Sequence, residues 1–531
     1  MERFAKLIDT LVYTGSRNAK LRQIAEYLRE TPDPDRGWAL AALTDGLDFA
    51  AVKSTTIRNA MKERVDPVLW SLSRDFVGDT AETASLLWPE PHGKIAPPPT
   101  VSEAVEALTA MTRATAPKDL PALLDRLDPS GRYALLKLAT GAMRIGISAR
   151  LGKVAFAQAF DVSVDDVEEY WHALQPPYQE LFAWAADGAA PPDTENVPLF
   201  RPFMLAHPLE DTVVSMDNYA AEWKWDGIRV QLVNVAGETR VYSRSGDDIS
   251  ATFPELVTAL QIPAVVDGEL LVRGSVQGGE AVGAASFNAL QQRLGRKTVS
   301  KKMLADAPAF VRLYDALIIG GKDLRSLAWE ARRKQLEALV PQLPDSHFDI
   351  SQIVHADTFD QLAEIRATVR DDAIEGLMLK RRDSPYIAGR KTGLWYKWKR
   401  DPLLIDCVLM YAQRGSGKRS SFFSDYTFGC WNGDPDKGAD LLPVGKAYSG
   451  FTDEELKKLD RHVRQNTLNR FGPVRETDKS LVFEVAFDSV HESKRHKSGL
   501  AMRFPRIHRI RWDKPPHEAD RIGSLQALIR D

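Results

Sequence analysis

The chain has 531 residues, of which 44% are hydrophobic and 27% charged, and its formal net charge at pH 7 is −3. This composition is typical of a folded globular protein and excludes a disordered or fibrous one. The length exceeds what one hydrophobic core supports, so we expect two to four domains. A global polycation is also excluded, so any nucleic-acid partner must be met by local basic surfaces.

The cysteine content and the N-terminus bear on the compartment. Only two cysteines, Cys407 and Cys430, are present, which excludes a disulfide framework and a four-cysteine zinc site. The N-terminal residues carry charges at once and lack the apolar run of a signal peptide, and no segment approaches the length of a membrane span. We therefore expect a cytoplasmic protein that works in a reducing compartment without a membrane partner.

The first part of the chain has the periodicity of amphipathic helices. Apolar residues follow the i, i+3, i+4, i+7 spacing twice, first at Phe4, Leu7, Ile8 and Leu11 and then at Leu21, Ile24, Ala25 and Leu28. Similar segments continue to about residue 178, and β signals are scarce. The pattern predicts an all-α domain over residues 1–190. Prolines and polar residues at 190–198 then predict a linker.

From about residue 200 the pattern becomes mixed α/β. Short strands are predicted at 221–225, 228–235, 239–245, 264–272 and 310–319, and a helix at 327–340. After about residue 402 only short strands follow, at 403–412, 425–431 and 480–490, with turns rich in Gly, Ser and Asp between them. That spacing fits a small β-barrel. The mixed segment is therefore expected to end at 402, and the barrel to cover 403–531.

One lysine in the mixed segment stands in an unusual setting. In "EWKWDGIR" (222–229), tryptophans flank Lys224 and an Asp-Gly turn leads directly to Arg229. A single lysine of this kind is most often a surface residue. An ordered series of further segments follows it: "YSRSGDD" (242–248), "VVDGELL" (265–271), "LYDAL" (313–317), "EGLMLK" (375–380), "WYKWK" (395–399) and "RFPRIHRIRWDK" (503–514).

In this order and spacing, the segments resemble the nucleotidyltransferase motifs of ATP-dependent DNA ligases, over residues 201–514. The stretch at 141–160 is also similar to the DNA-binding domain of these ligases. The resemblance implies a multidomain protein with three parts. These are an all-α DNA-binding domain at 1–190, an α/β (α+β) adenylation domain of the nucleotidyltransferase fold at 200–402, and a C-terminal OB-fold β-barrel at 403–531.

The chemistry of such enzymes explains the lysine. Joining a phosphate to a hydroxyl in water requires an activated phosphate, which a nucleophilic lysine stores as a phosphoramidate. A free lysine amine is protonated and unreactive at neutral pH. Cationic neighbours such as Lys397 and Lys399, together with a bound metal, would favour the reactive neutral amine and also hold a triphosphate. Lys224 is thus the candidate nucleophile for the α-phosphate of ATP.

The resemblance also implies which residues hold the nucleoside. Glu222 resembles the carboxylate that recognises the adenine amino group, and Tyr314 resembles the aromatic platform under the base. Arg229 and Arg244 resemble the residues that hold ribose and phosphate. Without the other motifs, Tyr314 in its apolar strand would be taken for a core residue.

A further set resembles the phosphate and metal contacts. Glu269 resembles a sugar or metal contact, and Glu375 resembles the second acidic ligand of Mg²⁺. Lys397 and Lys399 resemble the α-phosphate contacts.

Five more cations complete the predicted site. Either Arg390 or Lys391 offers a further phosphate contact, and the family more often has arginine where Lys391 stands. Arg503, Arg506 and Lys514, from the last motif, are expected to orient the departing pyrophosphate of ATP.

The implied activity is ATP-dependent sealing of nicks in duplex DNA, in replication, repair or recombination. ATP is the co-substrate, Mg²⁺ the cofactor, and nicked double-stranded DNA the partner, encircled by a monomer. Three enzyme classes share the lysyl-nucleotide chemistry: RNA ligases, mRNA-capping-type nucleotidyltransferases and NAD-dependent DNA ligases. The last resemble the chain least, because they carry a four-cysteine zinc site. The alternative from another class is a DNA-binding protein without catalysis.

Overall fold

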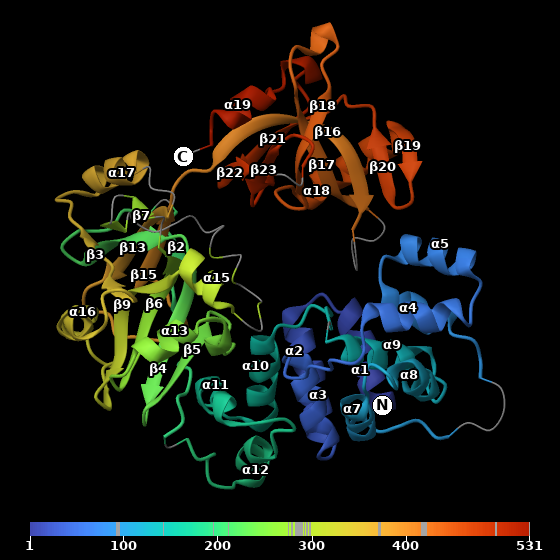
Figure 1. Cartoon of the computed structure of the whole chain (residues 1–531), viewed down its shortest axis with the longest axis horizontal. Helices are drawn as coiled ribbons and strands as arrows, with labels where there is room; N and C mark the ends of the chain where they lie inside the picture. Colours follow the sequence, from blue (N-terminus) through green and yellow to red (C-terminus); the bar gives the residue numbers. More distant parts are fainter. Residues whose placement is uncertain are drawn as a thin grey trace. The chain divides into compact units, whose positions relative to one another are not determined.

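The computed structural model describes residues 1–529 except 92–95, 142, 195, 211, 274–275, 278–279, 282–289, 291–292, 294–295, 297–298, 370–372, 416–421 and 494–495. The chain forms two compact units (Figure 1). One unit comprises Met1–Asp161, Pro176–Phe182 and Pro402–Asp531, and the other comprises Val162–Gln175 and Ala183–Asp401. In the ranges given above, no helix has both the length and the apolar character that crossing a membrane requires.

The N-terminal part of the first unit consists of helices, as the apolar spacing predicted. Its helices are α1 (Glu2–Tyr13), α2 (Arg17–Glu30), α3 (Asp35–Leu43), α4 (Ser54–Lys62), α5 (Pro67–Val77), α6 (Thr80–Leu87), α7 (Val101–Ala110), α8 (Ala116–Leu124), α9 (Pro129–Thr140) and α10 (Ala149–Phe160). The two predicted apolar stripes on α1 and α2 are buried throughout. Local sequence sets the ends of α9: the Asp128 side chain accepts from the Gly131 N–H at its start, and Gly141 ends it in a left-handed conformation.

The segment after α10 belongs to the second unit, although its sequence continues the helical pattern. It contains α11 (Val164–Tyr170) and a 3₁₀ turn, whereas the next helix, α12 (Gln179–Asp187), begins in the first unit and ends in the second. Glu169 of α11 is 2.6 Å from the Arg325 guanidinium, and the His172 ring centroid is 5.1 Å from that of Tyr242. These contacts attach α11 to the strands of the second unit. The three-domain division at 190 and 402 stays a prediction.

The second unit is built on two sheets, in which the strands at 219–225, 228–235, 238–243, 264–272 and 309–319 correspond to the five predicted ones and the remaining strands were not predicted. A six-stranded sheet has the order β10-β9-β6-β4-β5, with β11 beside β9, and a five-stranded sheet has the order β12-β3-β13-β15-β2. The strands of the first are β4 (Ile228–Val235), β5 (Glu238–Ser243), β6 (Ala264–Val272), β9 (Ala309–Ile319), β10 (Lys322–Asp323) and β11 (Phe348–Ile350). Those of the second are β2 (His207–Pro208), β3 (Tyr219–Trp225), β12 (Ile353–Val354), β13 (Ile374–Arg381) and β15 (Trp395–Lys399).

Shorter elements complete this unit. They are the paired strands β1 (Met204–Leu205) and β14 (Gly389–Arg390), the paired strands β7 (Val276–Gln277) and β8 (Glu280–Ala281), and the helices α13 (Pro254–Ala259), α15 (Lys301–Asp306), α16 (Trp329–Leu339) and α17 (Phe359–Thr368). The helix predicted at 327–340 corresponds to α16.

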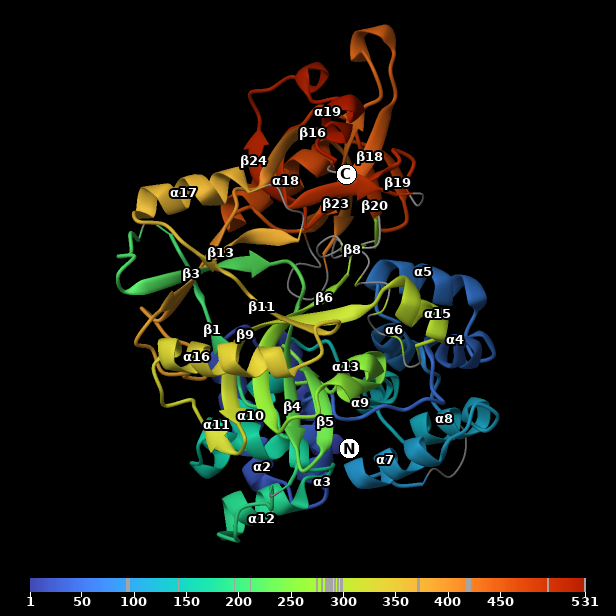
Figure 2. The ribbon, with the colours of Figure 1, turned by 60° about the vertical axis from the view of Figure 1, so that its left-hand side comes forward.

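The two sheets share a hydrophobic cluster, and helices cover the opposite faces (Figure 2). Val233 and Leu317 of the six-stranded sheet pack in one cluster with Ala220 and Trp395 of the five-stranded sheet. Leucines of α13 and α16 bury the other face of the six-stranded sheet, and Leu362 of α17 packs with the outer leucines of β13. Each buried leucine of this kind stabilises the fold by about 1.5–3 kcal/mol.

The C-terminal part of the first unit consists of a seven-stranded sheet, a separate two-stranded sheet and two α-helices. Its elements are β16 (Leu403–Arg414), β17 (Phe423–Trp431), β18 (Leu441–Ala447), α18 (Asp453–Gln465), β19 (Thr467–Phe471), β20 (Val474–Thr477), β21 (Val482–Phe487), β22 (Ser489–Glu492), β23 (Leu500–Arg503), β24 (Arg506–Arg511) and α19 (Ile522–Gln526). Seven strands pair in the order β18-β17-β16-β20-β19, with β21 between β16 and β24. The strand pairings among described residues do not close this sheet into a barrel. Cys407 and Cys430 are free, buried thiols in its core.

Candidate active site

The five-stranded sheet carries the predicted nucleophile on one of its faces. Along β3, successive side chains alternate between the two faces, so Glu222 and Lys224 share a face while Trp223 packs in the apolar cluster on the other. The alternation explains why "EWKW" combines two large apolar rings with two charged groups. The charged face is the inner one, toward the six-stranded sheet, because Ala220 of β3 belongs to the cluster that the sheets share.

Strand register brings more charge to the same face. Lys224 lies opposite Gly376 of β13, and Gly376 lies opposite Lys399 of β15. Two residues further along β13, Met378 lies opposite Lys397. Directly opposed residues of an antiparallel pair project from the same face. Lys397 and Lys399, predicted to bind the α-phosphate, are therefore placed beside the predicted nucleophile.

Glu375 contacts Lys224 through an irregularity in the strand. The Lys224 Nζ is 2.5 Å from the Glu375 Oε2, and the Lys399 Nζ is 3.3 Å from the same oxygen. The pairing of β13 with β3 shifts between Ile374 and Gly376, a bulge that re-aims the side chain between them. Burial opposes the ionisation of this carboxyl, but the two ammonium groups lower the pKa of Glu375 to about 2. Glu375 is thus an anion in close contact with the amine.

Two glycines in the predicted motifs are required by close packing of the backbone. A Cβ on Gly376 would lie 2.2 Å from the Trp398 carbonyl oxygen, and its φ of +146° disfavours any side chain. A Cβ on Gly227, in the Asp-Gly turn after Lys224, would lie 2.4 Å from the Leu270 carbonyl oxygen. Gly376 within β13 and Gly227 in the turn after β3 therefore allow the backbone to approach neighbouring strands more closely than any side chain would permit.

Five cations gather on this side of the site. The pKa of Lys397 is lowered by its burial and by the positive charges of four neighbours, Arg390, Lys399, Lys224 and Arg244. Each of these five residues was predicted to take part in catalysis or to bind ATP. Mutual repulsion of this kind is relieved when a polyanion binds between the groups.

The two candidates for the additional phosphate contact differ in position. Arg390 ends the short strand β14, which pairs with β1 so that Arg390 lies opposite Leu205, and its charge acts on Lys397. Both Arg390 and Lys391 are exposed, but only Arg390 is among the charges that lower the pKa of Lys397. The geometry therefore favours Arg390.

The six-stranded sheet contributes the residues predicted to hold the nucleoside. Arg229 of β4 lies opposite Glu269 of β6. The guanidinium of Arg229 donates to Asp267 at 2.8 Å and to the Met204 carbonyl oxygen at 2.6 Å. It also lies 5.7 Å from the ring centroid of Tyr314. Arg229 and Tyr314, from two strands of the six-stranded sheet, are thus close to each other.

Asp267 is a site residue that the sequence reading missed. It is fully buried, and it accepts from the Tyr386 hydroxyl at 2.6 Å, from Gln231 at 2.9 Å and from Arg229. These three donors fix the carboxylate, and the carboxylate in turn fixes the guanidinium of Arg229. The available signal was a carboxylate in the middle of the apolar run "AVVDGELLV".

Lys380 is a second missed residue. Its Nζ is 3.1 Å from the Glu222 Oε2 and 3.3 Å from the Tyr314 carbonyl oxygen, and both Lys380 and Glu222 are 1% exposed. A buried lysine needs a paired anion, so the final residue of the apolar strand "EGLMLK" was a signal for such a pair. Its partner, however, lies 158 residues earlier in the sequence.

Glu269 is a carboxylate held in an unfavourable environment. Burial and the nearby charge of Glu375 raise its pKa, while Lys224, Arg229 and the Gly227 N–H lower it, and the net result is a pKa of about 7. At neutral pH this site therefore holds one carboxylate that is ionised, Glu375, and one that is partly protonated.

Replacing Glu269 with glutamine should stabilise the protein more at high pH than at low pH. The folded-state pKa of about 7 lies above the ordinary 4.5, so folding favours the protonated carboxyl, and this contribution is lost as the pH rises through 7. We expect Glu269→Gln to raise the Tm by a few degrees at pH 8 in EDTA, and by less at pH 5.5. Glu210→Gln, at an exposed position, is the control. An equal rise at both pH values would contradict the assigned ionisation.

Three predicted residues, Arg503, Arg506 and Lys514, lie in the other unit. Arg503 ends β23 and Arg506 begins β24. Arg506 is 3.3 Å from Asp488, and the Lys514 Nζ is 2.7 Å from the Asp406 Oδ2. Lys514 is thus held by a carboxylate of its own sheet.

The carboxylates of the second unit are compatible with a divalent ion without forming a closed cage. Glu269 and Glu375 lie close enough for the charge of one to raise the pKa of the other. Within the described ranges, no group of three or more His, Cys, Asp or Glu side chains is arranged to hold a metal. This donor set suits Mg²⁺, which usually takes one or two carboxylates and keeps waters or phosphate oxygens as its other ligands.

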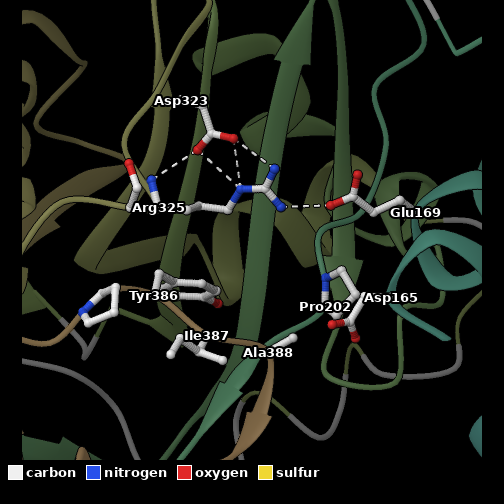
Figure 3. A pocket seen from close by; sticks show the side chains of 10 residues that line it. Asp165, Glu169, Pro202, Asp323, Arg325, Tyr386, Ile387 and Ala388 are labelled. Atoms are coloured by element: carbon white, nitrogen blue, oxygen red, sulfur yellow. Dashed lines mark hydrogen bonds and ion pairs between the residues drawn. The ribbon is translucent and has the colours of Figure 1, made fainter. Parts of the chain in front are cut away.

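A cavity of about 540 Å³ lies beside α11 in the same unit. Figure 3 shows Arg325 in it, held by Asp323 on one side and Glu169 on the other, with Tyr386 on the opposite wall. The polar groups of Arg325 are thus paired with the walls of the cavity itself. None of the residues that the sequence predicted for catalysis lines it.

An amine in contact with a carboxylate and close to several cationic side chains is suited to covalent nucleotidyl transfer. Comparison with known proteins agrees with this class. Residues 203–399 match the family model of the ATP dependent DNA ligase domain, and residues 419–514 match that of the ATP dependent DNA ligase C terminal region. The chain belongs to the ATP-dependent DNA ligase family.

Individual relatives support this assignment. A probable DNA ligase of Koribacter versatilis is 30% identical over 584 residues, covering 100% of this chain and 96% of that protein. A probable DNA ligase of Anaeromyxobacter sp. is 35% identical over 423 residues, covering 77% of this chain and 78% of that protein. A solved structure described as Pmar-Lig_Pre has the same fold, with a TM-score of 0.59 at 16% identity over 96% of this chain and 99% of that one.

Proposed function

We propose that Lys224 carries AMP when this ligase seals a nick in duplex DNA. The observation that carries the proposal is the contact of the Lys224 amine with Glu375 at 2.5 Å, on a face where Lys397 and Lys399 are also gathered. The face combines a nucleophile with cations suited to a triphosphate. A DNA-binding protein without catalysis would have no need of this combination.

The first step forms a bond between Lys224 and the nucleotide. The Nζ attacks the α-phosphorus of ATP, the bond to the β-phosphate oxygen breaks, and pyrophosphate leaves. Lys397, Lys399 and Arg390 neutralise the negative charge that develops on the phosphates. The ammonium of Lys224 must lose a proton first. Glu375, with a pKa of about 2, is a poor acceptor and is proposed to orient the amine, while the proton passes to water that reaches the 22%-exposed side chain.

Two carboxylates are proposed to hold Mg²⁺, namely Glu269 and Glu375. When bound, the ion supplies further neutralisation of phosphate oxygens. Glu222, Tyr314 and Arg229 are proposed to bind the adenosine part, with the Arg229 guanidinium fixed by Asp267.

The remaining two steps transfer AMP and join the strands. An oxygen of the 5′-phosphate attacks the phosphorus of the adenylate, the P–N bond breaks, and Lys224 is released. The 3′-hydroxyl then attacks the 5′-phosphate, and AMP leaves. We propose that three domains enclose the nicked duplex as a monomer in the cytoplasm: the helical part at 1–190, the adenylation part at 200–402, and an OB-fold barrel completed from the sheet at 403–531. The helical segment and the seven-stranded sheet support this division.

One experiment tests the catalytic proposal. The full chain is incubated with α-labelled ATP and Mg²⁺, denatured, and examined for label on the polypeptide, and a nicked duplex is then added with ATP or with NAD. We expect label at Lys224, and sealing with ATP alone. A protein that bound ATP and nicked DNA but never became labelled would contradict the proposal.

Binding to DNA should depend steeply on salt, because each phosphate that the protein neutralises releases counterions. The basic segment around α10 exposes Arg144 and Arg150. Reversing both to glutamate should lower the slope of log K against log salt by about 2, and should leave lysine adenylation unchanged. The control reverses Arg113 and Lys118, which are exposed elsewhere on the helical part. Equal losses in the two double variants would show that this segment has no special contact with DNA.

A further inference from the structure

Lys380 is buried in a position where its charge acts mainly on one residue. It lies two residues beyond Met378 on β13, and Met378 is directly opposite Glu222 on β3, so the Nζ reaches the Glu222 Oε2 at 3.1 Å. Three aromatic rings surround the ammonium, with centroids 4.6 Å (Tyr314), 4.8 Å (Trp395) and 5.8 Å (Trp329) from it. The rings exclude water, and this burial lowers the pKa of Lys380, whereas the ring faces and the charge of Glu222 favour its cationic form.

The second oxygen of Glu222 is in a different situation. Among the described residues, no donor forms a hydrogen bond with the buried Oε1. The nearest cation is Arg333 of α16, whose NH1 is 3.5 Å away. A buried carboxylate oxygen without a hydrogen bond is costly unless a ligand supplies the donor. One oxygen of Glu222 is therefore held by Lys380, while the other has Arg333 as an ion-pair partner but no hydrogen bond.

The ionisation of Glu222 depends on its neighbours. Burial raises the pKa of Glu222 above its ordinary value, and Lys380, Arg333 and the Ser351 hydroxyl offset part of that rise. The charged or titratable groups that face this carboxyl are thus Lys380 from β13, Arg333 from α16 and Tyr314 from β9. Lys380 has the shortest of these contacts. Without it, the neutral acid would be favoured in this environment.

We propose that Lys380 is a positioning residue for base specificity, which holds Glu222 as an ionised acceptor for the exocyclic amino group of adenine. The inference rests on the proposed adenylation of Lys224. An ionised carboxylate can only accept hydrogen bonds. It therefore binds the amino group of adenine and repels the carbonyl oxygen that hypoxanthine and guanine carry at the same position. A protonated Glu222 would donate to that carbonyl oxygen instead, so the charge of Lys380 decides which base fits.

The test compares three nucleotides as donors for lysine labelling: ATP, ITP, and purine riboside triphosphate, which lacks the amino group. In the wild type, ATP should be preferred to both. Lys380→Met should lower the preference for ATP over ITP by about tenfold or more, because a hydrogen bond to a charged group is lost. The remaining preference should increase with pH as Glu222 ionises. Lys380→Arg keeps the positive charge and should therefore retain most of the wild-type preference for ATP over ITP.

Controls separate this role from a structural one. Lys137→Met removes another buried lysine, which pairs with Asp79 in the helical part, and should leave the nucleotide ratios unchanged. An equal loss of activity with all three nucleotides in Lys380→Met would show that Lys380 serves only the fold, and would overturn the inference. Absence of label from the wild type would instead contradict the adenylation of Lys224.

A second pair of variants covers the case in which Lys380→Met does not fold. In the Glu222→Gln background the buried lysine has lost its charged partner, so the double variant removes both charges together. Lys380 acts through Glu222, so Glu222→Gln and the double variant should have the same ATP-to-ITP ratio. A further change of this ratio in the double variant would overturn the inference, because Lys380 would then act on the base by another route.

Discussion

Replacing Lys224 with alanine should reduce covalent AMP and ATP-dependent sealing below detection. No other described lysine combines a position on this sheet face with a 2.5 Å contact to Glu375. The final step needs no lysine nucleophile, so the variant should still join a nick that already carries a 5′-adenylate. The two reactions are measured side by side, with labelled ATP for the first and a synthetic adenylated nick for the second.

A matched variant controls for the loss of a lysine from the same unit. Lys322→Ala removes an exposed lysine on β10 and should leave both reactions unchanged. Normal labelling of Lys224→Ala would assign the nucleophile to another residue. Loss of both reactions would indicate that the lysine supports the fold or the binding of DNA.

The second large effect is expected at the last motif. Arg503→Ala or Lys514→Ala should slow lysine adenylation by about 10²–10³-fold, because the departing pyrophosphate loses an oriented cation. The same variants should largely spare the sealing of a pre-adenylated nick, which involves no pyrophosphate. Single-turnover rates of the two reactions, measured separately, decide the matter. Equal losses in both would mean that these residues act on DNA or on folding.

The structure provides a control residue for this prediction, Arg509, and shows that Lys514 contacts Asp406. Arg509 is an exposed arginine on the same strand, β24, and Arg509→Ala should leave adenylation unchanged. The Lys514 Nζ is 2.7 Å from Asp406, which the Arg511 guanidinium also approaches to 3.7 Å. The predicted role of Lys514 in orienting pyrophosphate requires that its ammonium first leave this carboxylate. Asp406→Asn should therefore change the adenylation rate and not the sealing of the adenylated nick.

The elements themselves were well predicted from local pattern. Alternation in "AEWKW" and "AVVDGELLV" gave β3 and β6, and the helical spacing of "LAWEARRKQLEALV" gave α16. Period-2 and period-3.6 patterns reflect burial on one face, which is a local property of the chain. The same alternation placed Glu222 and Lys224 on one face before any strand pairing was known.

Features that depend on strand register could not be predicted in this way. The pair of Lys380 and Glu222 joins residues 158 positions apart, and the contact of Glu375 with Lys224 depends on a bulge in β13. Neither register nor bulges follow from the periodicity of one strand. The closed barrel is a similar case, because the predicted strands are present but the described pairings leave the sheet open.

The order of the strands along the chain has a consequence for the synthesis of the enzyme. Lys224 is made with β3, but its neighbours across the sheet, β13 and β15, are made only when residues 374–399 have followed. A chain still attached to the ribosome before that point has the lysine without Glu375, Lys397 or Lys399, and contacts this distant in sequence form late in folding. Reactivity toward ATP should therefore begin only after the last strand of the sheet has emerged, so that nascent or truncated chains do not consume the nucleotide.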